Sequence, residues 1–485
     1  MSIPKSPITK TNDILNKFLL LAWWVLCCLS VWIVLNNLFL NPHRDEFEHL
    51  RSAWFVHEGL VPYRDFFQHH HPLLWYCLSP LYDLFEKTAD IYAVSRLLML
   101  GLYAGTLGWM AVIVRRFSDS IVSVLATFFF YNSYTITDYQ FLVVRPDNPM
   151  LFFMLAGIYF FIRYSQEHTP RDLVISYASF FLSFCFLQKI VLFLIPFGLW
   201  QGYVIATKRI PFKVAISALI GPFLCGIGYV LYLIYQGDFR DYWELNWLLN
   251  LYWFRDYQVY MMTVTDKIYL ALYLCFLGII LIKGRGLIRQ STAVLMTYTV
   301  LFLGTPHPYP CYFLPQTVFT AVVLGLGFGM YHHIVLTTLK ALFVITFGLS
   351  AIIPAFAKPN GYDIFNMGER RYIEDYIQPG DQLLSYNSQV SPYFKLLPLH
   401  YYWFGLARGA LTDHRRFQRH PLPDLNAILR EHHPRFVLKD VLKDVEKTRD
   451  EENAPILFQP DEEILKQYYR KTPVPDLYER ISDTK

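Results

Sequence analysis

The segment after the first long apolar run carries two adjacent carboxylic acids, Asp45 and Glu46. They follow the run 18–40, whose last residues are VWIVLNNLFL, after only four intervening residues. Ionisable groups at the edge of a bilayer are costly to place and usually have a functional role. A carboxylate there could act as a general base that accepts the proton of a hydroxyl group. The structural alternative is that both acids stabilise the positive N-terminus of a helix.

Four further segments place polar or ionisable side chains next to apolar runs. These side chains are His69, His70 and His71 in FFQHHHPLLWY, Arg145 and Asp147 in RPDNP, Lys189 in LQKIV, and His307 and Tyr309 in TPHPYPCYF. Cationic groups among them could stabilise negative charge that develops during a reaction. Each also has a structural reading, for example Asp147 as a helix cap and Lys189 as a side chain that reaches the interface. The functional prediction therefore rests on their joint placement.

The elements that must position these residues are membrane-spanning helices. The chain has 485 residues, 54% apolar and only 17% charged. A span needs about 20 apolar residues, each rising about 1.5 Å, and the runs 18–40 and 213–235 reach that length. The sequence predicts an all-α polytopic membrane bundle with a retained first span. A net charge of +4 without basic blocks argues against nucleic acid as a partner, and the seven cysteines show no disulfide or metal-binding pattern.

Basic residues are distributed unevenly between the connections. We expect about eleven spans, within a range of eleven to thirteen, at 18–40, 91–114, 120–136, 148–163, 172–187, 190–206, 213–235, 267–282, 290–305, 311–331 and 334–356. The short connections on one side hold thirteen basic residues and four acidic ones, and such loops stay in the cytoplasm. This rule places residues 1–17 in the cytoplasm and the candidate residues on the outer side. The predicted location is a bacterial inner membrane, with the C-terminal part in the periplasm.

The first outer loop and the tail complete the predicted architecture. Within the loop 41–90, helically spaced apolar residues and the segment 72–86 predict interfacial helices that lie along the membrane. The aromatic and acidic loop 236–266 also suits the interface. In the tail 357–485, GDQLLSYNS and RFVLKDV read as strands, and DLNAILREHH and PDEEILKQYYRK read as helices. The tail predicts a small outer-side α/β domain after a membrane domain at 18–356, whose first outer loop would be catalytic.

The motifs together resemble a known superfamily. The segment HRDEFEHLRSAWFVHEGLVPYRDFFQHHHPLLWY, followed by RPD, QK and PYPCYFLP, is similar to the GT-C superfamily of integral-membrane glycosyltransferases. Within it, the chain resembles the branch that contains the protein O-mannosyltransferases and the lipid A aminoarabinose transferase. The resemblance implies a polyprenyl-phosphate-linked sugar as donor. It also implies transfer to a glycan, lipid or protein acceptor at the outer face, among membrane lipids.

The resemblance implies roles for individual residues as well. The acidic pair of the family corresponds to Asp45, as general base, and Glu46, which would orient the acceptor or a metal ion. The later outer-loop aspartate of the family corresponds to Asp147. A lysine of the family corresponds to Lys189. Given a phosphate as leaving group, the candidate residues on the side of the donor phosphate are Arg145, Lys189, His70, His307 and Tyr309. Relatives often carry a metal-binding acid where this sequence has histidines, so the candidate ligands of a divalent metal ion are His69, His70, His71 and Glu46. A single displacement would invert the anomeric configuration.

Two other functions are open on the sequence alone. A multi-span transporter would use similar helices, but transporters tend to carry repeats and polar sites at mid-membrane. Here no repeat is obvious, and the polar residues lie at one rim. A non-catalytic partner of an envelope-polysaccharide assembly complex would keep Asp45 and Glu46 only to hold a helix. Replacement of Asp45 by asparagine separates these readings, because only a catalyst would lose transfer.

Overall fold

The computed structural model describes most of the membrane part and portions of the tail. The described residues are 17, 21, 24, 25, 28, 44–85, 88–137, 142–251, 264–305, 310–330, 376–378, 380–384, 395–397, 425–438 and 460–481. The chain divides into two compact units, each assembled from separate stretches. The first comprises Met1–Leu38, Arg96–Gly228 and Tyr257–Pro359, and the second comprises Phe39–Ser95, Tyr229–Asp256 and Asn360–Lys485.

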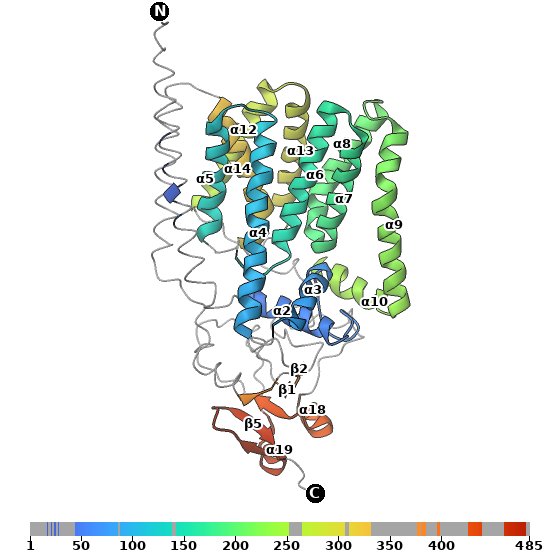
Figure 1. Cartoon of the computed structure of the whole chain (residues 1–485), viewed down its shortest axis with the longest axis vertical. Helices are drawn as coiled ribbons and strands as arrows, with labels where there is room; N and C mark the ends of the chain where they lie inside the picture. The colour runs from blue at the N-terminus through green and yellow to red at the C-terminus, as the bar shows by residue number, and fades with distance from the viewer. Residues whose placement is uncertain are drawn as a thin grey trace, which may run out of the picture. The chain divides into compact units, whose positions relative to one another are not determined.

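Long apolar helices make up the described part of the first unit and stand side by side (Figure 1). They are α4 (Thr88–Arg115), α5 (Ile121–Thr137), α6 (Asp147–Glu167), α7 (Pro170–Phe186), α8 (Val191–Ala206), α9 (Phe212–Gln236), α12 (Val264–Lys283), α13 (Gly286–Leu303) and α14 (Leu314–Met330), of which α4 and α9 extend into the second unit. Helix α14 packs against α5 and α12, α13 packs against α12 and α8, and α6 packs against α7. The helices form one bundle.

Four of the described helical stretches are long and apolar enough to cross a membrane: Asp90–Arg115, Gln188–Ala206, Phe212–Gln236 and Gly286–Leu303. Their surfaces expose large apolar side chains such as Leu199, Phe223 and Val300, as expected where a helix faces lipid. The prediction of a polytopic helical bundle is confirmed. The predicted spans 18–40 and 334–356 lie outside the described residues except for single positions, so the total of eleven spans stays a prediction.

Small residues let neighbouring helices of the bundle approach closely. A Cβ atom added to Gly325 of α14 would lie 2.6 Å from the backbone oxygen of Ser123 and would clash with Thr127, both on α5. A Cβ atom on Gly327 would likewise meet the ring of Phe276 on α12. Close approach through small residues is a common means of helix packing in membranes. These two glycines therefore fix how α14 packs between its neighbours.

Shorter helices form the outer-loop part of the second unit. Helix α2 (Arg44–His57) buries the predicted apolar stripe that begins at Phe47. Its polar residues are also buried, namely Glu46, Glu48, His49, Arg51 and Ser52. Helix α3 (Leu73–Leu78) and the 3-10 helix η1 (Ser79–Asp83) follow. They are too short to cross a hydrocarbon core of about 30 Å, in line with the prediction that 72–86 is not a span.

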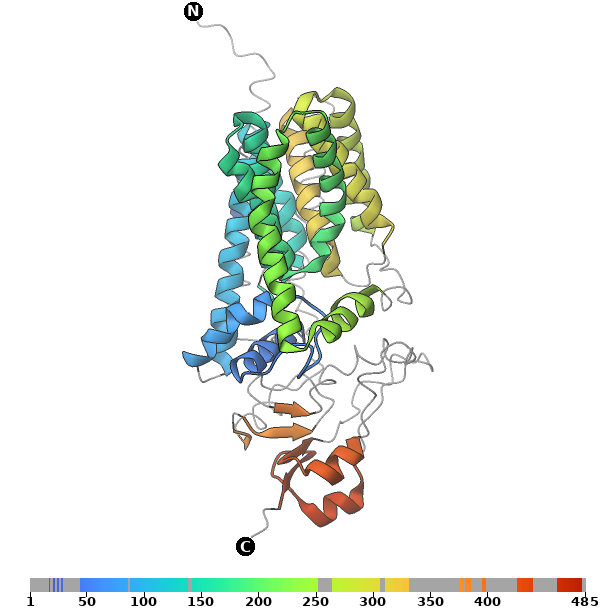
Figure 2. The same ribbon diagram turned by 90° about the vertical axis from the view of Figure 1, so that its right-hand side faces the viewer.

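The described tail contains a five-stranded sheet in the order β2-β1-β3-β5-β4. Its strands are β1 (Gln382–Leu384), β2 (Lys395–Leu397), β3 (Phe436–Leu438), β4 (Tyr469–Lys471) and β5 (Leu477–Arg480). Strand β1 pairs in parallel with β2 and β3, whereas β5 is antiparallel to β3 and β4. Figure 2 shows the helices α18 (Leu425–His432) and α19 (Glu462–Tyr468) beside the sheet. Their apolar residues share one core with the strands, made of Leu384, Leu429, Val437, Ile464, Leu465 and Tyr469.

One element of the tail differs from its prediction. The segment 460–471 was expected to be helical throughout, but the helix ends at Tyr468 and residues Tyr469–Lys471 form β4. This strand pairs with β5, with Tyr469 opposite Arg480, and the Tyr469 hydroxyl donates to the backbone oxygen of Pro434 at 2.9 Å. The local pattern was wrong here because pairing with a later strand outweighs helix propensity.

Candidate active site

A buried carboxylate with two cationic partners lies in the first unit. Asp147 is the first residue of α6 and is 1% exposed. The Nε atom of Arg145 donates to its Oδ2 at 3.1 Å, and the Nζ atom of Lys189 donates to its Oδ1 at 3.3 Å. The structure therefore brings together three residues that the sequence placed in two separate motifs. Together their side chains carry a net charge of +1.

The position of Lys189 follows from the backbone around it. Helix α7 ends at Phe186, Leu187 is extended, and Lys189 lies in the 3-10 helix η2 (Gln188–Ile190) before α8 begins. Its ammonium group lies 3.4 Å from the ring centre of Tyr312, which precedes α14 in the 3-10 helix η4 (Pro310–Phe313). The side chain of Lys189 is 18% exposed, whereas that of its carboxylate partner Asp147 is 1% exposed.

Contacts between α6 and α7 hold these residues in register. Ser176 and Ser183 of α7 donate hydrogen bonds to the backbone oxygens of Gly157 and Met150 on α6, at 2.8 and 2.7 Å. A Cβ atom at Gly157 would lie 2.7 Å from the ring of Phe180, so the helices are already in close contact. Because Asp147 begins α6 and η2 follows α7, this packing sets the distance between the carboxylate and Lys189.

The acidic pair Asp45 and Glu46 occupies the first turn of α2 in the second unit. Asp45 is half-buried, and Glu46 is fully buried. A position at a helix N-terminus suits both readings of the pair, as a base or as residues that stabilise the helix dipole. Asp45 is thus less deeply buried than Glu46.

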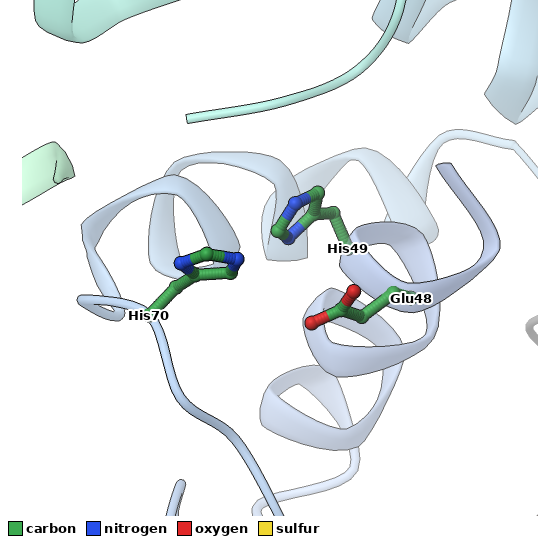
Figure 3. Close-up of side chains that lie close together, drawn as sticks. All are labelled: Glu48, His49 and His70. Atoms are coloured by element: carbon green, nitrogen blue, oxygen red, sulfur yellow. The ribbon is translucent and has the colours of Figure 1, made fainter. Parts of the chain in front are cut away.

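One helical turn further along α2, a group of metal-binding residue types comes together. Glu48, His49 and His70 each offer one ligand atom, and these atoms all lie within 4.8 Å of one another. Figure 3 shows the carboxylate and the two rings turned toward a common space, with Glu48 and His49 on the helix and His70 on the facing loop. Within the described part of the chain, His70 is therefore the predicted metal ligand that belongs to such a group.

The other two histidines of the triplet lie differently. The Nδ1 atom of His69 is 3.7 Å from Oε1 of Glu48, and its ring centre is 4.0 Å from that of His70. His71 instead faces Tyr242, with 3.4 Å between its Nε2 atom and the tyrosine hydroxyl. Burial lowers the pKa of His71 to about 3, so this imidazole is neutral at physiological pH.

Sequence reasoning missed Glu48 and His49 as members of a site. The signal was present in the spacing, because residues three and four positions after Asp45 lie on the same face of a helix as Asp45. The predicted phosphate-side residues His307 and Tyr309 lie outside the described residues. Their neighbour Tyr312, which was not singled out, is the aromatic residue in contact with Lys189.

Comparison with known structures shows that the chain shares its fold with a solved protein of low sequence identity. One similar structure is ArnT from Cupriavidus metallidurans bound to undecaprenyl phosphate, with a TM-score of 0.54 and 10% identity over 88% of this chain and 92% of that chain. Another match is the oligosaccharyltransferase AglB from Archaeoglobus fulgidus in complex with an inhibitory peptide and a dolichol-phosphate, with a TM-score of 0.31 and 12% identity over 79% and 64%. No family model matches the chain, and no curated protein matches it in sequence.

Proposed function

We propose that this chain is a glycosyltransferase that moves a sugar from a polyprenyl-phosphate-linked donor to an acceptor on the outer face of the membrane. The observation that carries the proposal is the group formed by Asp147, Arg145 and Lys189 in a chain with a GT-C fold. The ArnT structure of similar fold is bound to undecaprenyl phosphate, which supports a lipid phosphate as the carrier of the donor sugar here.

The cationic group suits a lipid phosphate in charge and geometry. Arg145 and Lys189 together outweigh the single negative charge of Asp147, and hydrogen bonds from cations to phosphate are strong. Asp147 holds both cations in fixed positions before the ligand arrives, so little reorganisation is needed when negative charge develops on the phosphate. In this role Asp147 positions Arg145 and Lys189, and those two residues contact the phosphate.

The proposed reaction is one displacement at the anomeric carbon. The oxygen of an acceptor hydroxyl forms the new bond to that carbon, and the bond from the carbon to the phosphate oxygen breaks with its electron pair on the oxygen. The hydroxyl proton passes to the carboxylate of Asp45, while Glu46 orients the acceptor. The products are an inverted glycoside and a free lipid phosphate, whose added negative charge Arg145 and Lys189 stabilise.

A release assay tests the proposal directly. The full chain in lipid nanodiscs is incubated with undecaprenyl-phosphate-linked hexoses and pentoses and a bacterial membrane extract that supplies acceptors, and free undecaprenyl phosphate is measured by mass spectrometry. We expect release with at least one donor and a loss of about 100-fold or more in Asp45→Asn, the size typical for removal of a general base.

The matched control is Asp83→Asn, which removes an exposed carboxyl of the same loop, 70% accessible. It should release lipid phosphate at the rate of the unmodified protein. The proposal is overturned if no donor is consumed, or if Asp45→Asn keeps the full rate.

A further inference from the structure

We propose that the connection between α8 and α9 binds an anionic phospholipid. The phosphate of the lipid contacts Lys208 and Arg209, and its acyl chains lie along the exposed apolar faces of the two helices. The basic turn is defined here as residues 207–211. It follows α8, whereas Lys189 precedes α8, so the basic turn lies at the other end of this helix from the candidate active site. The inference is therefore separate from the proposed function.

The cations of the basic turn differ in their partners from a cation at the adjoining ends of α6 and α7. There, Arg163 of α6 lies 2.9 Å from Asp172 of α7, and the charges neutralise each other. The stretch 173–237, which contains the basic turn, has no acidic residue. Within the described part of the chain, neither Lys208 nor Arg209 forms an ion pair. Their positive charges are thus available to an anion from outside the chain.

The backbone of the basic turn is fixed by hydrogen bonds to the last turn of α8. The N–H of Lys208 donates to the backbone oxygen of Ile205 at 2.9 Å, and the N–H of Arg209 donates to that of Val204 at 3.0 Å. Ile210 is buried and anchors the turn in the bundle, while both cationic side chains are exposed. A backbone that is already ordered loses little freedom when a ligand binds.

Lys208 has a left-handed backbone conformation, with a φ of 58°. This conformation is strained for a lysine, whereas glycine adopts it at no steric cost. The geometry of the turn alone would therefore favour glycine at this position. Strained residues that persist in a fold are often functional, and a cation held for a ligand accounts for the lysine.

Arg209 is held against α8 by an aromatic ring. Its guanidinium carbon lies 5.8 Å from the ring centre of Tyr203, within the range of a cation–π contact. Tyr203 is exposed, and tyrosine is enriched where a membrane meets water. A guanidinium group can donate two parallel hydrogen bonds to a phosphate, so the contact with Tyr203 positions a strong phosphate ligand at the level of the lipid headgroups.

Apolar side chains flank the basic turn on both helices. On α9, Phe212, Ile216 and Ile220 are exposed and recur every four residues, which places them on one face of the helix. On α8, Leu199 is exposed two turns before the basic turn. Figure 1 shows α9 at the edge of the bundle. A lipid with two acyl chains matches this surface, because its headgroup and its chains meet the basic turn and the apolar faces together.

The charge of the turn selects the class of phospholipid. In a zwitterionic lipid the phosphate is balanced by an ammonium group, which the two cations of the turn would repel. Phosphatidylglycerol carries a net negative charge and no ammonium group. The basic turn also belongs to the connections that the charge distribution predicts to be cytoplasmic, and anionic lipids attract basic segments at that surface.

Native mass spectrometry tests the proposal on the full chain. The protein is delipidated in detergent and titrated with phosphatidylglycerol or with phosphatidylcholine of the same acyl chains. We expect the first phosphatidylglycerol to bind about tenfold more tightly, and to raise the melting temperature, because a ligand that binds the folded state stabilises it. Glycerol phosphate, which has the phosphate but no acyl chains, should not displace it. Equal affinities for the two lipids, or displacement by glycerol phosphate, would overturn the proposal.

A double variant and a control distinguish a site from diffuse attraction. Lys208→Gln with Arg209→Gln should lower the affinity for phosphatidylglycerol about 30-fold or more, since hydrogen bonds from two charged groups are lost. Lys213→Gln removes an exposed cation from the first turn of α9. It should cost at most about fivefold, the effect of a cation that only lies near a charged surface. An equal loss in the control would show that no site exists.

Lys208→Gly separates binding from folding. It relieves the strained backbone conformation, so the melting temperature without lipid should stay the same or rise. The affinity for phosphatidylglycerol should fall about tenfold, because one charged hydrogen bond is lost. An unchanged affinity in this variant would contradict the role of Lys208.

Discussion

The ammonium group of Lys189 lies 3.3 Å from Oδ1 of Asp147, across 42 positions of sequence, and 3.4 Å from the ring centre of Tyr312. One face of the lysine is thus held by a buried carboxylate and another by an aromatic ring. Such a cation is fixed in direction before any ligand binds, which is the arrangement expected of a group that stabilises developing charge. The contribution of Lys189 to ligand binding and its contribution to the stability of the fold can be measured in separate experiments.

Replacement of Lys189 by methionine should weaken the binding of undecaprenyl phosphate. Methionine keeps much of the side-chain volume but removes the charge, and a hydrogen bond from a charged group contributes about 1.5–3 kcal/mol, which corresponds to roughly ten- to hundredfold in affinity. Titration of the lipid phosphate into the protein in nanodiscs, followed by native mass spectrometry, measures the change. Lys213→Met, an exposed lysine on α9, serves as control, and equal affinities of the two variants would contradict the prediction.

Asp147 and Lys189 should also be coupled in stability. Asp147→Asn leaves two cations without their carboxylate, and Lys189→Met leaves the carboxylate with Arg145 alone, so each single change should destabilise the fold. The double variant should lose less than the sum of the two, by about 1 kcal/mol, as is usual for residues in direct contact. Denaturant unfolding in detergent provides the four free energies of the cycle. Additive effects would show that the pair makes no energetic contribution of its own.

The helical bundle and the group of Arg145, Asp147 and Lys189 could be predicted from the sequence, because both depend on simple sequence patterns. Apolar runs of the length of a span predict helices, and the described helices α4 to α9 and α12 to α14 fall on the predicted spans. Ionisable residues at the ends of such runs gather where the helices end together. That reasoning anticipated the meeting of Arg145, Asp147 and Lys189. Their catalytic role stays a prediction.

The outer loop could be predicted less well, because the orientation of its side chains depends on partners far away in the sequence. His69, His70 and His71 were all predicted as candidate metal ligands. In the structure, however, Asn250 donates to the backbone oxygen of His69 and Tyr242 faces His71, and these partners lie 181 and 171 positions later in the sequence. Glu48 and His49 were not singled out from the sequence as members of a site. Their burial depends on the residues that pack around α2, and a local sequence pattern does not predict that packing.

The glycine at position 325 should resist enlargement. Gly325→Ala places a methyl group 2.6 Å from the backbone oxygen of Ser123, and the backbone of α5 can yield only by moving as a helix. Overpacking of this kind costs about 1–3 kcal/mol, which a lower melting temperature in detergent would report. Gly221→Ala on α9 is the matched control, since nothing lies within 4 Å of its added Cβ atom, and there alanine should be neutral or stabilising. A melting temperature of Gly325→Ala equal to that of the control would contradict the packing seen here.

Asp238 should make stability depend on pH in a direction opposite to that of an ordinary ion-paired acid. Burial raises the pKa of Asp238 to about 6 from an ordinary 3.8, against the opposing effect of Arg64 and with a further increase from Asp241. Between these two values the folded state holds a proton that the unfolded state releases, so the contribution of Asp238 to stability is present at low pH and is lost as the pH rises toward 6. Asp238→Asn mimics the protonated acid. It should therefore raise the melting temperature most at pH 7.5 and clearly less at pH 5.

The exposed Glu58 provides the comparison for this effect. Glu58→Gln should change the melting temperature little, and by the same amount at both pH values. Differences between variant and unmodified protein are compared at each pH, so that titration of other groups cancels. A gain from Asp238→Asn that is equal at pH 5 and pH 7.5 would mean that the variant acts through packing, and that the carboxyl of Asp238 is ionised in the folded protein at both pH values.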